Sequence, residues 1–297
     1  YQDNKLIMEP SQKYMFKYKG HYFATHTTLE HVATLEDFEI QDSDIFLVTY
    51  PKSGTVWTQN ILSLIMHEGH RNGTENMETM DRIPWIEYNM RNVDYTALPN
   101  PCFLTNHLPY FSLNPILLNK KARVIYVSRN PKDVLVSYYY FSKFMIIMEQ
   151  IPDFNVFMER FLAGTVPSSS WLDHVSGWYS HAEDFNILFL TYEEMKKDLR
   201  SAVLKICNFL GKKLSEEEVD SVVRQATFEN MKKDPRANYE NLPDDVVAKD
   251  KGSFLRKGKE GAENTTTVAQ SERFDKFMKE KMKSLPIKFV WDMNEDN

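Results

Sequence analysis

The sequence predicts an α/β fold in which a central parallel β-sheet is flanked by helices. Four short apolar runs recur along the chain, separated by longer amphipathic stretches: IFLVTY (45–50), CFLT (102–105), VIYVS (124–128) and ILFLT (187–191). Each run is hydrophobic on both faces, which is typical of buried parallel strands. A chain of 297 residues with 42% hydrophobic content can bury one large core, so we expect a single domain spanning residues 1–297.

Two of the intervening stretches have a helical period. Residues 56–68 and residues 193–210 each carry apolar side chains on one face, so each is predicted to form a helix packed on the sheet. Gly211 is expected to be the C-cap of the second helix. Residues 232–264 contain Pro, Asn, Asp and Gly without a clean period, which indicates a long functional loop.

Composition excludes several classes of protein. The balance of 36 basic and 42 acidic residues gives a net charge of −6, which argues against a general nucleic-acid or anionic-membrane binder. No run approaches the roughly 18 apolar residues of a membrane span, and we expect a cytoplasmic protein. Cys102 and Cys207 are too few for a disulfide framework. The HEGH segment at 67–70 lacks the HExxH spacing, so no metal site is expected.

A polar residue follows each of the four predicted strands. These residues are Lys52, His107, Arg129 and Tyr192. In open parallel sheets, ligands bind in the crevice beyond the carboxyl ends of the strands. The four side chains are therefore expected to face one crevice.

The segment YPKSGT, residues 50–55, predicts an anion site. A loop of small residues that enters a helix offers free N–H groups and the positive end of the helix dipole. Lys52 adds a positive charge at the same place. The segment lacks the GxxxxGK[ST] spacing of a nucleoside-triphosphate P-loop, so we expect a P-loop-like solution for a different ligand. The alternative is a simple turn that Ser53 or Thr55 caps.

Two more segments carry candidate anion contacts. In VSRNPKDVLVSYYYF (127–141), Arg129 and Ser137 can reach one phosphate together, unless Arg129 pairs with Asp133 instead. FLRKGK (254–259) adds three cations beside Gly258, although such a cluster is usually a solvated charge run.

His107 is the candidate general base. It lies in TNHLPYF (105–111), at a strand end and in apolar company, where a neutral imidazole could take a proton from an attacking hydroxyl or amine. Aromatic residues at 85–88 and 138–144 are core residues by default, but a dry pocket for a flat apolar acceptor would use the same types.

Together these residues resemble the cytosolic sulfotransferases, which move a sulfonate from 3′-phosphoadenosine 5′-phosphosulfate (PAPS) to small acceptors. TYPKSGTVW looks like the family's 5′-phosphosulfate loop, RNPKDVLVSYYYF like its 3′-phosphate element and FLRKG like its closing segment. The resemblance runs from about residue 10 to 290, and within the family the chain is most similar to the amine sulfotransferase branch.

The resemblance implies a role for each matching residue. His107 would be the general base, and Lys52 would stabilise the oxygen that bridges phosphate and sulfonate. The implied cofactor-binding residues are Lys52, Ser53, Gly54, Thr55, Val56, Trp57, Arg129, Ser137, Tyr192, Ala226, Thr227, Phe228, Met231, Phe254, Leu255, Arg256, Lys257 and Gly258. The expected acceptor-binding residues are Thr105, Asn106, His107, Trp85, Tyr88 and Phe141.

Four positions depart from the family pattern. Thr105 stands where the family often has a Lys, and Ala226 stands where a hydroxyl residue often touches adenine. The usual GDWKN reads GAEN at 261–264, one residue shorter and without its Trp. Glu263 replaces the Lys of the family's dimer motif, which argues against a homodimer.

The expected function is PAPS-dependent transfer of a sulfonate to a small apolar phenol, alcohol or amine. Two alternatives stay open: a protein that binds the 3′,5′-bisphosphate nucleotide but has lost efficient transfer, and a nucleoside-triphosphate kinase, which the missing Walker spacing disfavours. Glu149 is a candidate partner for an amine acceptor, because it lies near the aromatic segment in sequence.

Overall fold

The computed structural model describes residues 9–71, 74–117, 121–255 and 265–285. Its central sheet has four strands in the order β4-β3-β5-β6, all parallel to their neighbours. The strands are β3 (Ile45–Thr49), β4 (Phe103–Asn106), β5 (Arg123–Ser128) and β6 (Asn186–Thr191). Each predicted strand is present, so the α/β prediction is confirmed.

The register of the sheet brings the four strand ends to one edge. Val48 of β3 lies opposite Asn106 of β4 and Tyr126 of β5, and Ser128 of β5 lies opposite Thr191 of β6. The residues that follow the strands therefore leave the sheet close together.

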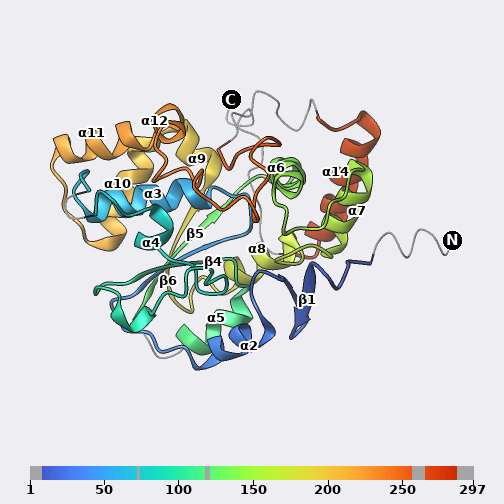
Figure 1. The fold of residues 1–297 in the computed structure, drawn as a ribbon, viewed down its shortest axis with the longest axis horizontal. Helices are drawn as coiled ribbons and strands as arrows, with labels where there is room; N and C mark the ends of the chain where they lie inside the picture. The colour runs from blue at the N-terminus through green and yellow to red at the C-terminus, as the bar shows by residue number, and fades with distance from the viewer. Residues whose placement is uncertain (1–8, 72–73, 118–120, 256–264, 286–297) are drawn as a thin grey trace.

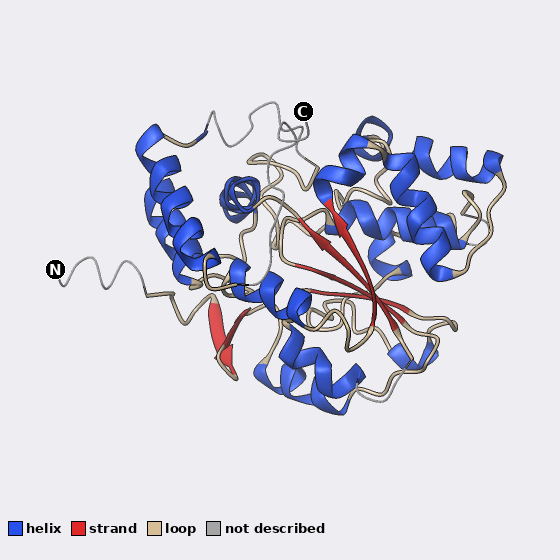
Figure 2. Ribbon diagram, turned by 180° about the vertical axis from the view of Figure 1, so that it is seen from behind, coloured by secondary structure: helices blue, strands red, loops and turns tan. Residues whose placement is uncertain are grey.

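Helices cover both faces of the sheet (Figures 1 and 2). The side chains of Ile45 and Leu47 belong to a core shared with α3 (Thr55–Met66), α10 (Leu199–Leu210) and α11 (Glu216–Gln225). Phe46 and Val48 belong to the opposite core, with α5 (Tyr110–Leu117), α6 (Pro131–Phe144) and α8 (Trp171–Ser180). Successive side chains of a strand point to opposite faces, so a strand between two helical layers must be apolar throughout.

The remaining elements surround this sandwich. An antiparallel hairpin consists of β1 (Met15–Tyr18) and β2 (His21–Ala24). The helix α14 (Val268–Met282) lies beside α7 (Phe154–Ala163) in Figures 1 and 2, and the rings of Phe161 and Phe274 stack across them with centroids 6.3 Å apart. The short helices are α2 (Leu29–Thr34), α4 (Thr79–Arg82), α9 (Tyr192–Lys197) and α12 (Phe228–Lys232), with single 3₁₀ turns at Leu35–Asp37 and Tyr95–Ala97.

The prediction of one helix over 193–210 was wrong, because the helix is interrupted at Asp198. This residue ends α9, and its side chain accepts a hydrogen bond of 3.0 Å from the amide of Ser201 as the N-cap of α10. Asp competes for backbone donors in this way and favours caps over helix interiors. Gly211 is the C-cap in the left-handed conformation, with φ 68°, as predicted. Of the loop expected over 232–264, Lys232 ends a helix, residues 233–255 contain no helix or strand, and residues 256–264 lie outside the described residues.

Within the described ranges, none of the helices has the length and apolar character needed to cross a lipid bilayer. In the same part of the chain, no three or more His, Cys, Asp or Glu side chains are grouped so that they could hold a metal ion.

Burial lowers the pKa of five histidines, His67 among them, and in the other four it lowers the pKa to about 4 or below. The pKa of His21 and that of His107 fall to about 3, and the pKa values of His26 and His174 fall to about 4. Burial has the opposite effect on a carboxyl group and raises the pKa of Glu87 to about 8. The folded protein therefore excludes protons from the histidines and retains one on the glutamate near neutral pH.

These shifts predict a loss of stability in mild acid. Between pH 7.5 and 5.5 the unfolded chain protonates its histidines while the folded chain does not, which costs about 1.4 kcal/mol for each of the four. Glu87 acts in the opposite direction, because only the folded state holds its proton, and it offsets about 2.5 kcal/mol of the stability lost through the histidines. We expect the free energy of unfolding, measured with urea, to fall by about 3 kcal/mol between these pH values.

A pair of variants tests the origin of this loss. His21 is buried on β2 against Phe23, so His21→Phe is expected to reduce the loss by about 1.4 kcal/mol. His70 is exposed, and His70→Asn is expected to leave it unchanged. An equal loss of stability in the wild type, His21→Phe and His70→Asn would contradict the assignment of this loss to buried histidines.

Candidate active site

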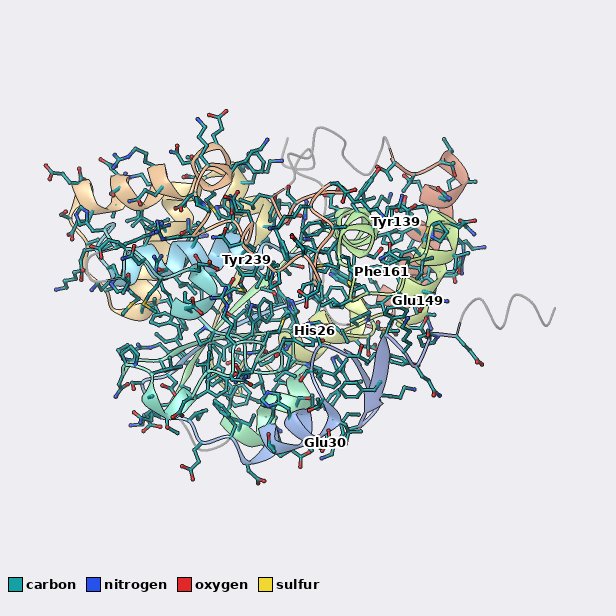
Figure 3. The ribbon with its side chains drawn as sticks, viewed as in Figure 1. His26, Glu30, Tyr139, Glu149, Phe161 and Tyr239 are labelled. Atoms are coloured by element: carbon teal, nitrogen blue, oxygen red, sulfur yellow. The ribbon has the colours of Figure 1, made fainter. Side chains whose placement is uncertain are left out.

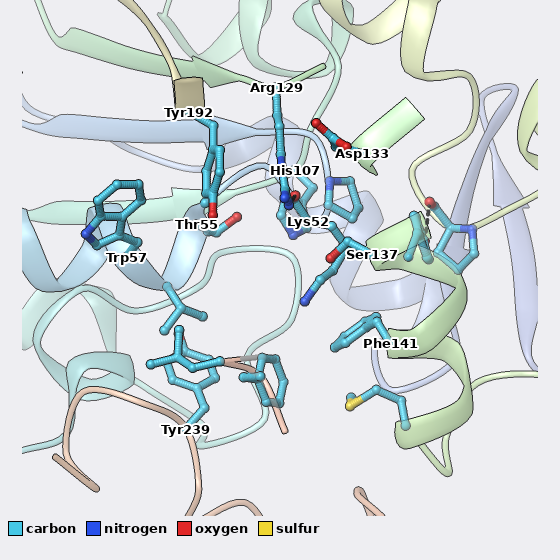
Figure 4. Close-up of a pocket in the computed structure, with 18 of the residues that line it drawn as sticks. Lys52, Thr55, Trp57, His107, Arg129, Asp133, Ser137, Phe141, Tyr192 and Tyr239 are labelled. Atoms are coloured by element: carbon cyan, nitrogen blue, oxygen red, sulfur yellow. Dashed lines mark hydrogen bonds between the residues drawn. The ribbon is translucent and has the colours of Figure 1, made fainter. Parts of the chain in front are cut away.

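A cavity of about 2140 Å³ opens at the carboxyl edge of the sheet. The four residues that follow the strands, Lys52, His107, Arg129 and Tyr192, all line it, and Figure 4 shows them converging from separate strands. The register of the parallel strands is the reason, because it makes all four loops begin at one edge. The structure thus brings together residues that are up to 140 positions apart in the sequence.

The loop between β3 and α3 forms a cradle of backbone amides. Lys52 and Gly54 both adopt positive φ angles, 67° and 91°. No side chain caps the first turn of α3, so its orphan amides and the positive end of its dipole face the cavity. The alternative of a turn capped by Ser53 or Thr55 is wrong: the Ser53 hydroxyl is buried without a partner in the described chain, and the Thr55 hydroxyl pairs with that of Thr49 at 2.7 Å.

Gly54 is required in this cradle for two reasons. Its φ of 91° is unfavourable for any residue with a side chain, and a Cβ atom there would lie 3.0 Å from Cδ2 of Tyr192. The tyrosine ring therefore packs directly on the loop backbone and holds it against the strand ends.

Arg129 joins this cradle from β5. Its Nη1 donates a hydrogen bond of 3.0 Å to the Lys52 carbonyl, and its guanidinium lies over the Tyr192 ring, 4.1 Å from the centroid. It makes no ion pair with Asp133 in the described structure, so that alternative is wrong. The buried Nε of Arg129 has no partner among the described residues. A buried cationic donor without a partner is costly, which favours an anionic ligand here.

His107 is held in one tautomer. Its Nδ1 lies 2.7 Å from the carbonyl oxygen of Thr49 and 3.0 Å from the hydroxyl of the same residue. A carbonyl oxygen only accepts, so Nδ1 carries the proton and Nε2 carries the lone pair. Nε2 has no hydrogen-bond partner within the described ranges, and the residue lines the cavity. Burial, and to a lesser degree the neighbouring His174 and the positive charge of Lys52, keep the pKa of His107 near 3, so the imidazole is neutral at physiological pH.

The backbone of His107 is held by two buried side chains. Its N–H donates a hydrogen bond of 3.0 Å to Oε1 of Glu87, and its carbonyl oxygen accepts a hydrogen bond of 3.0 Å from Nε2 of His174. His174 is 2% exposed, and its Nδ1 accepts a 2.8 Å hydrogen bond from the hydroxyl of Tyr126 on β5. The imidazole is thus oriented by three elements at once, which is what a positioned base requires.

Trp85, Glu87 and Tyr88 reach this site because their segment pairs with the edge of the sheet. The amide of Thr105 donates a hydrogen bond of 2.8 Å to the Pro84 carbonyl, and the amide of Ile86 donates one of 3.1 Å to the Thr105 carbonyl. This pairing places the Trp85 ring 4.6 Å from the His107 ring, measured between centroids.

The cavity beside His107 is apolar. Its lining there includes Trp85, Tyr88 and Phe141, all expected acceptor contacts, together with Met145, Met148 and Leu242. The Lys52 ammonium lies over the Phe141 ring, 4.4 Å from its centroid, so the cation borders this apolar space (Figure 4).

The opposite end of the cavity has a flat aromatic slot. Nε1 of Trp57 donates 2.8 Å to the carbonyl of Ala226, and the Trp57 ring makes an edge contact with Tyr192 at 5.4 Å. Other expected cofactor-binding residues line the same cavity: Thr55, Val56, Ser137, Thr227, Phe228, Met231, Phe254 and Leu255.

Several predicted site residues do not line the cavity. Ser53, Thr105, Asn106 and Ala226 are buried behind its wall. Thr105 accepts a 2.9 Å hydrogen bond from Nε2 of Gln59, which ties β4 to α3. The cofactor candidates Arg256, Lys257 and Gly258, and the dimer-motif residue Glu263, lie outside the described residues.

Glu149 does not line this cavity either. Its carboxylate pairs with Arg160 at 2.8 Å and accepts a hydrogen bond from the amide of Ser11. The structure therefore gives no support to the suggestion, made from proximity in sequence, that Glu149 pairs with an amine acceptor.

Sequence reasoning missed Thr49, Glu87 and His174. Each holds His107, but each lies at least 20 positions from it in the chain. No local pattern marks such contacts, since only the packing of strands and helices creates them.

Comparisons with known proteins agree with this geometry. The family model described as "Sulfotransferase domain" matches residues 42–286. The chain is 53% identical over 293 residues to the amine sulfotransferase of Oryctolagus cuniculus, covering 97% of each chain. It is 40% identical over 262 residues to Sulfotransferase 2A1 of Homo sapiens, covering 86% of this chain and 90% of that one.

Solved structures agree as well. A mouse sulfotransferase, SULT7A1, complexed with PAP superposes with a TM-score of 0.73 at 30% identity, covering 91% of this chain and 95% of that one. A retinol dehydratase in complex with retinol and PAP has a TM-score of 0.83 at 23% identity, covering 97% and 96%, and shows the same fold.

Proposed function

The chain belongs to the sulfotransferase domain family, and from this premise we propose how its residues carry out sulfonate transfer from PAPS. The protein is a PAPS-dependent sulfotransferase. One observation carries the assignment of roles: the lone pair of His107 and the ammonium of Lys52 face the same cavity, next to an uncapped helix N-terminus.

The cradle fits the donor nucleotide. The first turn of α3 and Lys52 would hold the 5′ phosphosulfate, while Arg129 and Ser137 would hold the 3′-phosphate. The unpartnered Nε of Arg129 supports this, because a phosphate oxygen would supply the missing acceptor. The slot at Trp57, Tyr192 and Phe228 would take the adenine.

His107 would act as the general base. When the acceptor attacks the sulfonate, the proton of its O–H or N–H passes to Nε2, which is the basic nitrogen of the fixed tautomer. As the new bond to sulfur forms, the bond from sulfur to the bridging oxygen breaks, and the electron pair stays on the departing phosphate. Lys52 would stabilise the charge that develops on that oxygen.

The acceptor is proposed to be a small apolar phenol, alcohol or amine that reacts in its uncharged form. The lining beside His107 is mainly aromatic and aliphatic. Residues 80–93 and 136–148, which are all described, contribute no carboxylate to it. The similarity to an amine sulfotransferase supports an amine among the acceptors.

A thermal-shift comparison tests the donor site. Adenosine 3′,5′-bisphosphate is expected to raise the melting temperature through mass action, and ATP with Mg²⁺ is expected to raise it much less. At a free concentration of about 100 times its dissociation constant, a ligand stabilises the folded state by about 2.7 kcal/mol. A larger shift with ATP and Mg²⁺ would contradict the proposal and favour a kinase.

Transfer itself is measured with labelled PAPS and a panel of phenols, alcohols and amines. Labelled product with at least one acceptor is expected. Tight binding of the bisphosphate without transfer to any acceptor would instead favour a nucleotide-binding protein that has lost activity.

We also propose that the protein acts in the cytoplasm. The two cysteines, Cys102 and Cys207, are both free thiols, which fits a reducing compartment.

A further inference from the structure

His26 is a second histidine at the acceptor end of the cavity that the transfer mechanism does not use. It follows β2, is half-buried and lines the same cavity as His107; Figure 3 labels it. Its ring stacks on Tyr88, with centroids 4.1 Å apart and an interplanar angle of 22°.

A wall of aromatic rings connects the two histidines. The His107 ring contacts Trp85 at 4.6 Å, Trp85 contacts Tyr88 at 6.5 Å, and Tyr88 stacks on His26. The hydroxyl of Tyr88 is fixed in turn by a 3.3 Å hydrogen bond from the amide of Ala24. An acceptor lying flat along this wall, with its nucleophile at His107, extends its far end toward His26.

The polar atoms of His26 lack partners. Nδ1 is buried and has no hydrogen bond, and Nε2 has none either within the described ranges. A neutral imidazole carries one N–H, and an N–H sealed from any acceptor is rarer and costlier than an unused lone pair. Since Nδ1 is the sealed nitrogen, the N–H belongs on Nε2, on the open side of a ring that lines the cavity.

His26 stays neutral in this setting, since burial lowers its pKa to about 4. His26 therefore presents an uncharged donor to the acceptor site, next to the aromatic rings of Tyr88 and Trp85. Such a site favours a ligand with a hydrogen-bond acceptor at that point over one that leaves the donor unpaired.

We propose that His26 is a specificity-determining residue, whose Nε2–H donates a hydrogen bond to an uncharged accepting group, such as a carbonyl or ether oxygen, at the far end of the acceptor. This rests on the proposed acceptor site and narrows its substrate class to bifunctional molecules: an apolar body, a nucleophile at one end and an uncharged hydrogen-bond acceptor at the other.

The test uses matched phenols of one ring, two fused rings and two linked rings, each with either an acetyl or an isopropyl group at the far end. The two groups have similar shape, but only acetyl accepts a hydrogen bond. With the protein saturated by adenosine 3′,5′-bisphosphate, the dissociation constant of each phenol is measured by calorimetry. We expect the acetyl compound of at least one length to bind about fivefold more tightly than its isopropyl partner.

Three variants separate the hydrogen bond from the packing. His26→Phe keeps a ring on Tyr88 and is expected to abolish the acetyl preference while isopropyl affinity stays within about twofold. His26→Gln places an N–H near the Nε2 position and is expected to retain the preference, whereas His26→Asn reaches only the Nδ1 position and is expected to lose it. If His26→Phe does not fold, the Gln and Asn pair decides the question.

The proposal is overturned if the wild-type protein shows no acetyl preference at any length, or if His26→Phe retains it. These binding measurements need no turnover. A failure of sulfonate transfer would therefore count against the proposed reaction and leave the assignment of His26 to be decided by the affinities.

Discussion

Replacing His107 by asparagine is expected to lower kcat by about 10²- to 10⁴-fold, which is the usual contribution of a positioned general base. The Asn amide nitrogen stands near the position of Nδ1, so it can still donate to the Thr49 carbonyl that now accepts at 2.7 Å. What the variant lacks is the lone pair of Nε2. Binding of adenosine 3′,5′-bisphosphate, followed by thermal shift, is expected to stay unchanged.

His181 provides a matched control for this substitution. Its Nδ1 also lies 2.7 Å from a backbone carbonyl, that of Gly177, but the residue does not line the cavity. His181→Asn is expected to retain full kcat. Unchanged turnover in His107→Asn would remove the assignment of the base.

The pH dependence of kcat offers an independent check on His107. Because its pKa is lowered to about 3, the base is already unprotonated throughout pH 6–8. With an alcohol acceptor, whose own hydroxyl does not ionise in this range, kcat is expected to show no decline toward pH 6. A decline with a midpoint near 6.5 would mean that His107 titrates like an exposed histidine.

Replacing Lys52 by methionine is expected to lower kcat by about 10²- to 10³-fold, comparable to the loss of one oxyanion-hole donor. Methionine keeps the length and apolar stem of the side chain and removes only the charge. The backbone contribution of residue 52, its carbonyl bond to Arg129, does not depend on the side chain. The effect is therefore expected in kcat, with acceptor affinity changed by less than about threefold.

Lys143→Met is the control for Lys52. Its ammonium lies 4.2 Å from the centroid of the Tyr139 ring, much as that of Lys52 lies 4.4 Å from the centroid of Phe141, but Lys143 does not line the cavity. Initial rates with saturating PAPS compare the two variants. Equal rates in both would show that the Lys52 charge does not stabilise the leaving phosphate.

Thr105 illustrates where the family pattern and the structure of this chain meet. By resemblance to the family, Thr105 stands where a lysine would add a second positive charge near the sulfonate. In this chain the Thr105 hydroxyl accepts a hydrogen bond from Gln59 behind the cavity wall. Residue 105 is neutral, while the ammonium of Lys52 borders the space beside His107, so the replacement of Lys52 is expected to have a large effect.

Local patterns in the sequence were sufficient to predict the sheet and the edge of it at which the candidate site lies. Apolar runs covered on both faces, and the small residues of YPKSGT before a helix, are properties of adjacent residues, so a sequence displays them directly. The break at Asp198 was missed, because a helical period continues across it while the Asp side chain caps the following helix.

The sequence by itself determined the α/β class, the parallel strands, the phosphate-type loop and the family, since each depends on neighbouring residues or on motifs in order. Only the tertiary structure decided which nitrogen of His107 is basic, that Thr105 is buried behind the cavity wall and that His26 lines the same cavity as His107. These features depend on contacts between segments distant in the chain, where hydrogen-bond geometry and burial, set by packing, fix the chemical state of each group.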